Sequence, residues 1–199
     1  MPRITEEAKQ ERRERILAGA RRCFARYGYE GATVVRLEQE TGLSRGAIFN
    51  WFGSKDDLFV ELAARDNERL SRIWIDEGLD ATFRALLDED PDWLGVYLSV
   101  AHRLRTDPAF RERWQQRAQA PQALLQQIVE RMRREQAAGA LRDDLEPEAI
   151  GRFLGVVFDG VVIQRAAGFD PGLDVVRALV RDALAPRASE RARAEALTP

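Results

Sequence analysis

Apolar residues recur at helical spacing along almost the whole chain, and no run shows the alternating pattern of a half-buried strand. The pattern predicts an all-α fold. Glycines such as Gly28 and Gly42 fit helix ends, and prolines at positions 91, 108, 147 and 171 fit first helical turns. The predicted helices cover residues 5–27, 33–42, 44–51, 54–76, 78–88, 92–105, 108–137, 146–167 and 170–185.

Composition narrows the class of protein. With 199 residues, 45% of them hydrophobic, the chain can build a core of ordinary size. Its one cysteine, Cys23, excludes an intramolecular disulfide and fits a reducing compartment. No apolar run reaches the roughly 20 residues of a membrane span, and the charged stretch Met1–Arg15 is unlike a secretory signal. We therefore expect a cytoplasmic protein with no membrane contact.

The sequence contains few of the residue patterns that are typical of enzyme active sites. The chain has one cysteine on an apolar helical stripe and one histidine, His102, and it has neither a phosphate-binding loop nor a His-Glu-x-x-His pair. We therefore predict no enzymatic activity, no catalytic residues and no required cofactor. Carboxylate chemistry is left open by this count, as is the binding of a metal.

Two short predicted helices meet at the turn Thr41-Gly42-Leu43-Ser44. Gly42 relaxes the turn, and Leu43 supplies an apolar residue that fixes the angle between the helices. The second helix opens with the small or polar residues Ser44 to Ala47, which lets its N-terminal end enter a DNA major groove. A plain helical hairpin inside a bundle is the alternative interpretation.

A linked series of motifs decides between these interpretations. It comprises Gly31-Ala32-Thr33-Val34, Thr41-Gly42-Leu43-Ser44-Arg45-Gly46, Ile48-Phe49-Asn50-Trp51-Phe52 and Ser54-Lys55-Asp56-Asp57-Leu58. Over residues 16–58 the chain resembles the DNA-binding domain of the tetracycline-repressor (TetR) family. The resemblance implies an N-terminal three-helix domain with a helix-turn-helix, followed by a helical domain for ligand binding and dimerisation.

The family resemblance also implies the residues that meet double-stranded DNA. Phe49 and Trp51 stand where the family usually has tyrosine and histidine, which leaves their phosphate contacts open. Arg12, Arg13 and Arg15 are either further backbone contacts or part of a solvated face. The predicted DNA-binding residues are Thr33, Arg36, Ser44, Arg45, Gly46, Ala47, Asn50, Trp51 and Lys55.

The segment Ile150–Ala167 is apolar nearly all round, so it needs cover on two sides. One side would meet the chain's own core and the other a second copy, with the following helix sharing the interface. A buried hairpin in a monomer is the alternative. A two-fold dimer places two reading helices for a near-palindromic operator. The predicted interface residues are Phe153, Val157, Phe158, Val161, Val176, Leu179 and Val180.

An effector pocket is expected between these helices and residues 58–137. Core packing is the plainer interpretation of the tryptophans, a solvated face that of the arginines, and a structural or surface role that of His102. Arg103 is suited to bidentate binding of a carboxylate. The candidate pocket residues are Trp74, Trp93, His102, Arg103, Asp159 and Gln164. Motifs including Leu104-Arg105-Thr106-Asp107-Pro108 resemble the actinobacterial aconitase-repressor group, which implies a tricarboxylate with a divalent cation as effector.

These inferences predict a DNA-binding domain over 1–53, an effector-binding and dimerisation domain over 54–186, and a frayed tail over 187–199. The predicted function is a sequence-specific repressor that a small-molecule effector releases from DNA by tilting the helix 54–76. An activator of the same architecture, a helical interaction protein and an enzyme are the alternatives.

Overall fold

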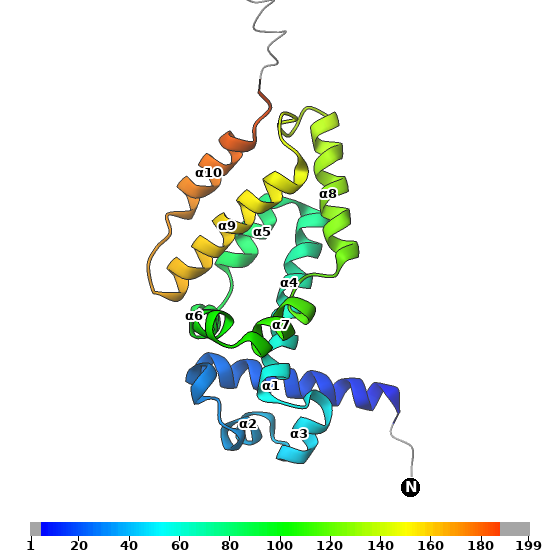
Figure 1. Cartoon of the computed structure of the whole chain (residues 1–199), viewed down its shortest axis with the longest axis vertical. Helices are drawn as coiled ribbons and strands as arrows, with labels where there is room; N and C mark the ends of the chain where they lie inside the picture. The colour runs from blue at the N-terminus through cyan, green and yellow to red at the C-terminus, as the bar shows by residue number, and fades with distance from the viewer. Residues whose placement is uncertain (1–4, 188–199) are drawn as a thin grey trace, which may run out of the picture.

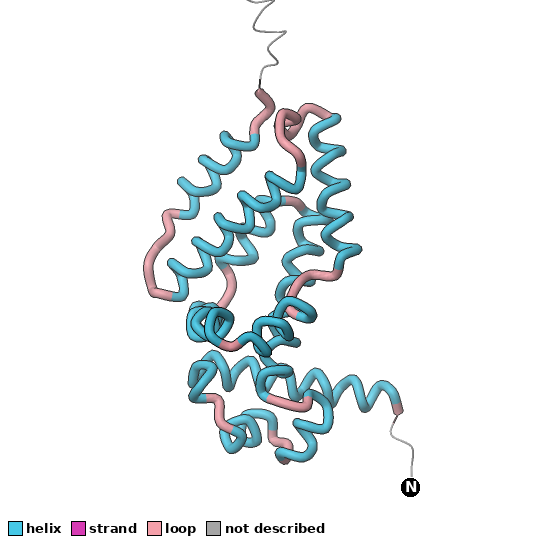
Figure 2. Tube along the Cα trace, in the orientation of Figure 1, coloured by secondary structure: helices cyan, strands magenta, loops and turns pink. Residues whose placement is uncertain are grey.

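The computed structural model describes residues 5–187, and within that range it consists of helices and loops, which confirms the all-α prediction (Figure 2). The prediction for the tail at 187–199 lies almost wholly outside the described residues. The helices are α1 Glu6–Gly31, α2 Val34–Thr41, α3 Arg45–Phe52, α4 Lys55–Glu77, α5 Leu79–Leu87, α6 Pro91–Thr106, α7 Pro108–Arg117, α8 Gln122–Ala137, α9 Pro147–Ala166 and α10 Leu173–Leu184 (Figure 1).

Side-chain caps set most of the early helix boundaries. Hydroxyl oxygens of Thr5, Thr33, Ser44 and Ser54 each accept a backbone N–H from the first turn of the helix that follows. Gly28 interrupts α1 with a positive φ of 68°, so the regular helix ends there and one further turn leads to Gly31. Local sequence signals therefore place α1 to α4 correctly.

Two predicted boundaries are wrong. The helix predicted over 108–137 is divided into α7 and α8 because Pro121 lacks a backbone donor and disfavours helical geometry at Ala120. The last helix begins at Leu173 and not at residue 170. Its N-cap is Gly172, with a positive φ of 60°, while Asp170 accepts the Gly172 N–H (2.9 Å) in the preceding turn.

The helices α1 to α3 form one end of the molecule, and α4 runs from that end into the rest of the bundle (Figure 1). One apolar cluster joins α1 to α3 with the first half of α4 and with α6 and α7. Phe59 lies at its centre, with its ring centroid 5.4–5.9 Å from those of Tyr29, Trp93, Tyr97 and Trp114. The core therefore continues across the predicted domain boundary at residues 53 and 54.

The close approach of α1 and α2 depends on Gly19. A Cβ atom at this position would lie 2.7 Å from the Thr41 methyl carbon and 2.9 Å from the Glu40 carbonyl oxygen. Only a residue without a side chain fits this contact, which holds the helix-turn-helix against α1.

A second apolar cluster is formed by α5, α8, α9 and α10. It buries Phe83, Ile128, Met132, Leu141, Ile150, Leu154, Val161, Leu173, Val180 and Leu184. The side chains of α9 and α10 thus share one core, and the opposite faces of the two helices are left outside it.

Candidate nucleic-acid interface

The turn between α2 and α3 is fixed by backbone geometry. Gly42 has a positive φ of 67°, and its N–H donates to the Glu38 carbonyl oxygen (2.9 Å). The buried Thr41 hydroxyl donates to the Leu37 carbonyl oxygen (2.7 Å) and accepts the Leu43 N–H (3.2 Å). These bonds hold the two short helices in one fixed relation.

The two faces of α3 have opposite character. Ile48 is fully buried and Phe52 is nearly so, and both anchor the helix in the first core cluster. The leading end of α3 is exposed at Ser44, Arg45 and Gly46. The solvent-facing side continues through Asn50 and Trp51, while Ala47 is half-buried. The predicted reading residues therefore lie on one accessible surface.

Two features of that surface bear on how it meets DNA. A Cβ atom at Gly46 would meet nothing within 4 Å, so packing within the chain does not require glycine there. The Arg45 backbone N–H donates to a Glu38 carboxylate oxygen (2.6 Å), so an acidic side chain satisfies the N-terminus of α3. Sequence reasoning missed Glu38, and its only signal was an acidic residue close before a helix start.

The remaining predicted contacts are partly engaged within the chain. Arg36 donates to the Gly31 carbonyl oxygen (2.8 Å), and its guanidinium lies 4.2 Å from the centroid of the Tyr27 ring. The Lys55 ammonium donates to the Tyr29 carbonyl oxygen (2.9 Å). Both cations are held at the edge of the surface, where each has donors left for a phosphate.

The arginines before the helix-turn-helix differ from one another. Arg13 forms an ion pair with Glu61 of α4, whereas Arg12 and Arg15 are exposed. Arg13 thus serves to fasten α1 to α4.

A polar joint, formed by Tyr29, Asp56, Arg103 and Arg113, connects the first helices to α6 and α7. Arg103 binds the Asp56 carboxylate through both terminal nitrogens (2.9 and 3.0 Å) and donates to the Tyr29 hydroxyl (2.6 Å). Tyr29 donates to Asp56, and Arg113 also pairs with Asp56 (3.2 Å). Arg103 therefore binds a carboxylate of its own chain, and its assignment to the effector pocket was wrong.

Contacts within the polar joint shift the pKa values of Asp56 and Tyr29 in opposite directions. Burial raises the pKa of Asp56, but hydrogen bonds from Arg103 and Tyr29 outweigh burial and leave the pKa below its ordinary value. Burial and the neighbouring Asp56 raise the pKa of the Tyr29 phenol. At neutral pH the joint thus holds a charged Asp56, a charged Arg103 and a protonated Tyr29.

A cavity of about 520 Å³ lies between α4, α5, α6, α8 and α9. Trp74 and Asp159, two of the candidate pocket residues, line it. Trp93 is buried outside its lining, and His102 and Gln164 are exposed elsewhere, so the prediction was wrong for these three residues. Sequence reasoning missed Asp66, Arg69, Glu89 and Tyr97 among the lining residues.

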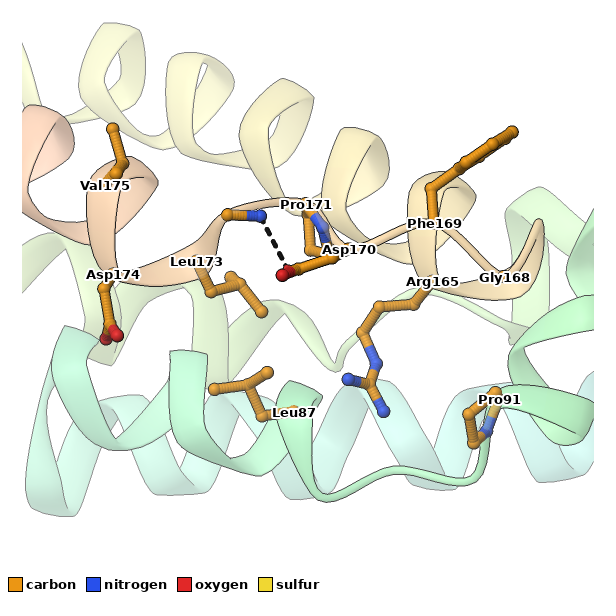
Figure 3. Close-up of a pocket in the computed structure, with 11 residues that line it drawn as sticks. Leu87, Pro91, Arg165, Gly168, Phe169, Asp170, Pro171, Leu173, Asp174 and Val175 are labelled. Atoms are coloured by element: carbon orange, nitrogen blue, oxygen red, sulfur yellow. Dashed lines mark hydrogen bonds between the residues drawn. The ribbon is translucent and has the colours of Figure 1, made fainter.

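A groove of about 690 Å³ lies beside the loop between α9 and α10 (Figure 3). Arg165 extends from α9 toward Leu87 and Pro91, while the Phe169 side chain points away from these two residues (Figure 3). Arg165 donates to the Glu89 carbonyl oxygen (3.1 Å). The groove and the cavity therefore both adjoin the loop that carries Glu89.

An apolar face covers the outside of α9 and α10. It consists of Phe153, Val156, Ile163, Val175 and Leu179, which are between 43% and 72% exposed. The predicted interface residues Val157 and Val176 are half-buried and pack against the second apolar cluster. Phe158 points inward: its ring centroid lies 4.9 Å from that of Phe83, and it lines the cavity, so the interface prediction is corrected at Phe158. Val161 and Val180 are buried in the chain's own core and offer no surface to a partner, so the prediction is corrected at these two positions.

Two kinds of feature are absent from the described residues. Between residues 5 and 187, no helix has the length and hydrophobicity that a membrane crossing demands. In the same range, no group of three or more His, Cys, Asp or Glu side chains is arranged to hold a metal ion.

Comparison with protein families gives two matches. Residues 16–62 match the model described as bacterial regulatory proteins of the tetR family, and residues 68–188 match the model of the C-terminal part of BetI-type transcriptional repressors. The first match covers α2 and α3, and the second covers most of the residues that line the cavity and all of the apolar face.

Individual relatives agree with these matches. The chain is 42% identical over 188 residues to the HTH-type transcriptional repressor Rv1474c of Mycobacterium tuberculosis, covering 91% of this chain and 99% of the relative. It is 43% identical over 178 residues to the HTH-type transcriptional repressor AcnR of Corynebacterium glutamicum, covering 85% and 92%. Among solved structures, Salmonella enterica GusR superposes with a TM-score of 0.69 at 22% identity, covering 92% and 99%.

Proposed function

The chain belongs to the TetR family of bacterial regulatory proteins, and we propose that it represses transcription by binding a near-palindromic operator as a cytoplasmic homodimer. Relatives about 40% identical over most of the chain are named repressors, which favours repression over activation and a regulator over an enzyme. The observation that carries the proposal is α3, which is anchored by the buried Ile48 and exposed at its leading end and along the side that bears Asn50 and Trp51.

The reading surface acts through two kinds of contact. Arg45 and Asn50 reach base edges in the major groove, because a guanidinium suits guanine and an amide suits adenine. Thr33, Arg36 and Lys55 meet phosphates at the edges of the same surface. Gly46 lets the backbone of α3 come close to the duplex. The flat Trp51 side chain, 38% exposed, replaces part of the phosphate contact that a histidine would make.

The dimer forms through the apolar face of α9 and α10. Val156, Val175 and Leu179 are each more than 60% exposed, and an apolar patch of this kind marks a site of protein association. Pairing with the same face of a second copy buries these side chains in a four-helix interface. The two-fold symmetry of such a pair matches the symmetry of a palindromic operator.

The cavity of about 520 Å³ receives the effector. Its size falls within the range of small-molecule sites, and aromatic walls such as Trp74 and Trp114 surround a few polar groups. A solved relative in fold, FadR of Bacillus subtilis, is in complex with stearoyl-CoA (TM-score 0.58, 14% identity).

A tricarboxylate with a divalent cation is the effector class that we propose. Arg69 supplies a guanidinium for a carboxylate of the ligand. Asp159 has no ion-pair partner among residues 5–187, and burial raises its pKa, so a cation beside it would be stabilising. Since one carboxylate is too few to hold a metal alone, the cation would be bound mainly by the ligand's own oxygens.

The test is binding of the purified protein to fluorescent duplexes from the upstream region of its own gene and of neighbouring genes. Wild-type protein is expected to bind one duplex in preference to the others. Arg45→Ala is expected to weaken that binding by roughly tenfold or more, since a good base contact contributes about 1–3 kcal/mol. The matched control is Arg133→Ala, because Arg133 is 60% exposed on α8, away from α3. Equal affinity for all duplexes, or an Arg45→Ala variant that binds like wild type, contradicts the proposal.

A further inference from the structure

Arg21 connects the DNA-binding helices to the second part of the chain. It projects from α1 and binds the Asp66 carboxylate of α4 through one nitrogen (2.9 and 3.1 Å to the two oxygens). Its other terminal nitrogen donates to Glu89 (2.6 Å), in the loop between α5 and α6. The Asp66 and Glu89 side chains are only 14% and 15% exposed, so solvent screens these pairs less than surface pairs.

Both carboxylates also belong to the wall of the cavity. Asp66 accepts the Trp93 indole N–H (2.7 Å) and the Tyr97 hydroxyl (3.2 Å). The Arg21 guanidinium lies 4.4 Å from the centroid of the Trp93 ring. Because Asp66, Glu89 and Tyr97 all line the cavity, the groups that hold Arg21 are in reach of whatever enters it.

Glu89 binds one cation with each carboxylate oxygen. One oxygen accepts from Arg21, and the other accepts from Arg69 of α4 (2.7 Å). Arg69 lines the cavity, whereas Arg21 belongs to α1. A single carboxylate thus joins a cation at the cavity to a cation of the DNA-binding helices. We name the three residues Arg69, Glu89 and Arg21 the Glu89 bridge.

We propose that the Glu89 bridge transmits the state of the cavity to the DNA-binding helices. The inference rests on the proposed function, since it requires that an effector binds in the cavity and that α3 binds DNA. It assigns a regulatory role to Arg21 and Glu89, which have no part in the reading surface.

The step is an exchange of ion-pair partners. A carboxylate of the effector binds Arg69 and withdraws it from Glu89. Glu89 then loses one of its two ion pairs, and with it the direct link from the loop at residues 88–90 to α4. Glu89, which binds Arg21, is then held less firmly. As a result α1 and the attached helix-turn-helix take a wider range of orientations. A dimer with less fixed reading helices binds a two-part operator more weakly, because ordering them costs free energy on binding.

The test is a double-mutant cycle that needs no effector. Arg69→Gln and Arg21→Gln each remove one cation from the bridge, and operator affinity is measured for both variants and for the double variant. We expect each single variant to weaken binding by about fivefold, at the lower end of typical coupling between sites. The double variant is expected to bind no more weakly than Arg21→Gln, because the signal from Arg69 passes through Glu89 to Arg21.

The control is Arg72→Gln, on the same helix as Arg69. Arg72 is 62% exposed and pairs only with Glu68 among the described residues, so it should leave operator affinity unchanged. Effects of Arg69→Gln and Arg21→Gln that multiply would overturn the proposal, as would an Arg69→Gln variant that binds like wild type. A bridge with a merely structural role would lower the melting temperature of each variant without this pattern in DNA affinity.

A second measurement separates failure of the bridge from failure of the proposed function. Hydrogen exchange of the α1 amides is followed in free wild-type protein, Arg69→Gln and Arg72→Gln. Arg69→Gln is expected to speed exchange in the α1 segment around Arg21, although, within residues 5–187, Arg69 is linked to Arg21 only through shared carboxylates, Glu89 at 2.7 Å and Asp66 at 4.0 Å. Unchanged α1 exchange in Arg69→Gln overturns the bridge. If no duplex binds wild-type protein, the proposed function fails, and the exchange data still decide whether the bridge exists.

Discussion

Arg103→Met tests whether the polar joint holds the DNA-binding helices in place. Methionine keeps the length and helix propensity of the arginine side chain but removes its charge and its donors. The substitution takes away the bidentate pair with Asp56 and the hydrogen bond to the Tyr29 hydroxyl. Arg113 is left as the arginine that pairs with Asp56 within the described residues.

The expected magnitude follows from the exposure of the pair. Removing one partner of a fully buried pair costs about 3–5 kcal/mol, and exposed pairs contribute about 0–1 kcal/mol. The Arg103 and Asp56 side chains are 23% and 22% exposed, and Asp56 keeps Arg113. We therefore expect a loss of about 2 kcal/mol in the free energy of unfolding, between these limits. For a chain of this size that corresponds to a melting temperature lower by about 4–8 °C.

The assay is thermal unfolding followed by circular dichroism at one fixed protein concentration, since unfolding of a dimer depends on concentration. Arg105→Met is the control, because Arg105 is an exposed arginine two positions further along the same helix. The double variant with Asp56→Asn should lose less stability than the sum of the two single losses. An Arg103→Met variant that melts within about 1 °C of wild type, or losses that add, would refute the reasoning.

Three further predictions concern other parts of the chain. Leu179→Asp is expected to give a monomer by light scattering and to abolish tight operator binding. The control Leu145→Asp, at an exposed leucine off the α9–α10 face, should remain dimeric. A dimeric Leu179→Asp variant would exclude this face as the interface. Gly19→Ala forces a Cβ atom against Thr41 and should lower the free energy of unfolding, measured in urea, by about 1–3 kcal/mol. Gly46→Ala, where the space around the Cβ position is open, should keep the stability of wild type but weaken DNA binding. Equal stabilities for the two variants would count against close packing at Gly19. The pKa of Asp56 is lower in the folded protein than in the unfolded chain, so its contribution to stability is present above the unfolded pKa and is lost as pH falls through the folded pKa. The difference in stability between wild type and Asp56→Asn should therefore be constant from pH 7 to 5 and shrink below about pH 4. A difference that widens on acidification would contradict the lowered pKa of Asp56.

The helix-turn-helix was readable from sequence because its determinants are local. Gly42 and the capping residues Thr33, Ser44 and Ser54 act within a few positions of where they stand. The exposed end of α3 follows from the same signals, since Ile48 and Phe52 fix which face is buried.

The polar joint and the Glu89 bridge were not readable in this way. Asp56 and Arg103 are 47 positions apart, and Arg21 and Glu89 are 68 apart. In a chain with 31 lysines and arginines, composition gives no reason to select these pairs. Long-range ion pairs depend on how helices pack, and helical periodicity does not contain that information.

The cavity and the apolar face were predicted in part. Asp159 was selected because a polar residue on an apolar helix needs a polar partner or a cavity, and it lines the cavity. His102 was selected for its chemistry alone, and it lies on the surface. α9 is apolar nearly all round, so its periodicity could not tell that Val161 faces the core and Val156 faces out.

The shared packing of α1, α4 and α6 has a practical consequence for engineering biosensors. Chimeric regulators are built by grafting the DNA-recognition segment of one protein onto the receptor of another, which assumes that the two parts are interchangeable modules. In this chain a graft cut at residue 53 would carry Arg21 and Tyr29 away from Asp66, Glu89 and Asp56. A chimera that responds to its inducer should therefore transplant both sides of these contacts together.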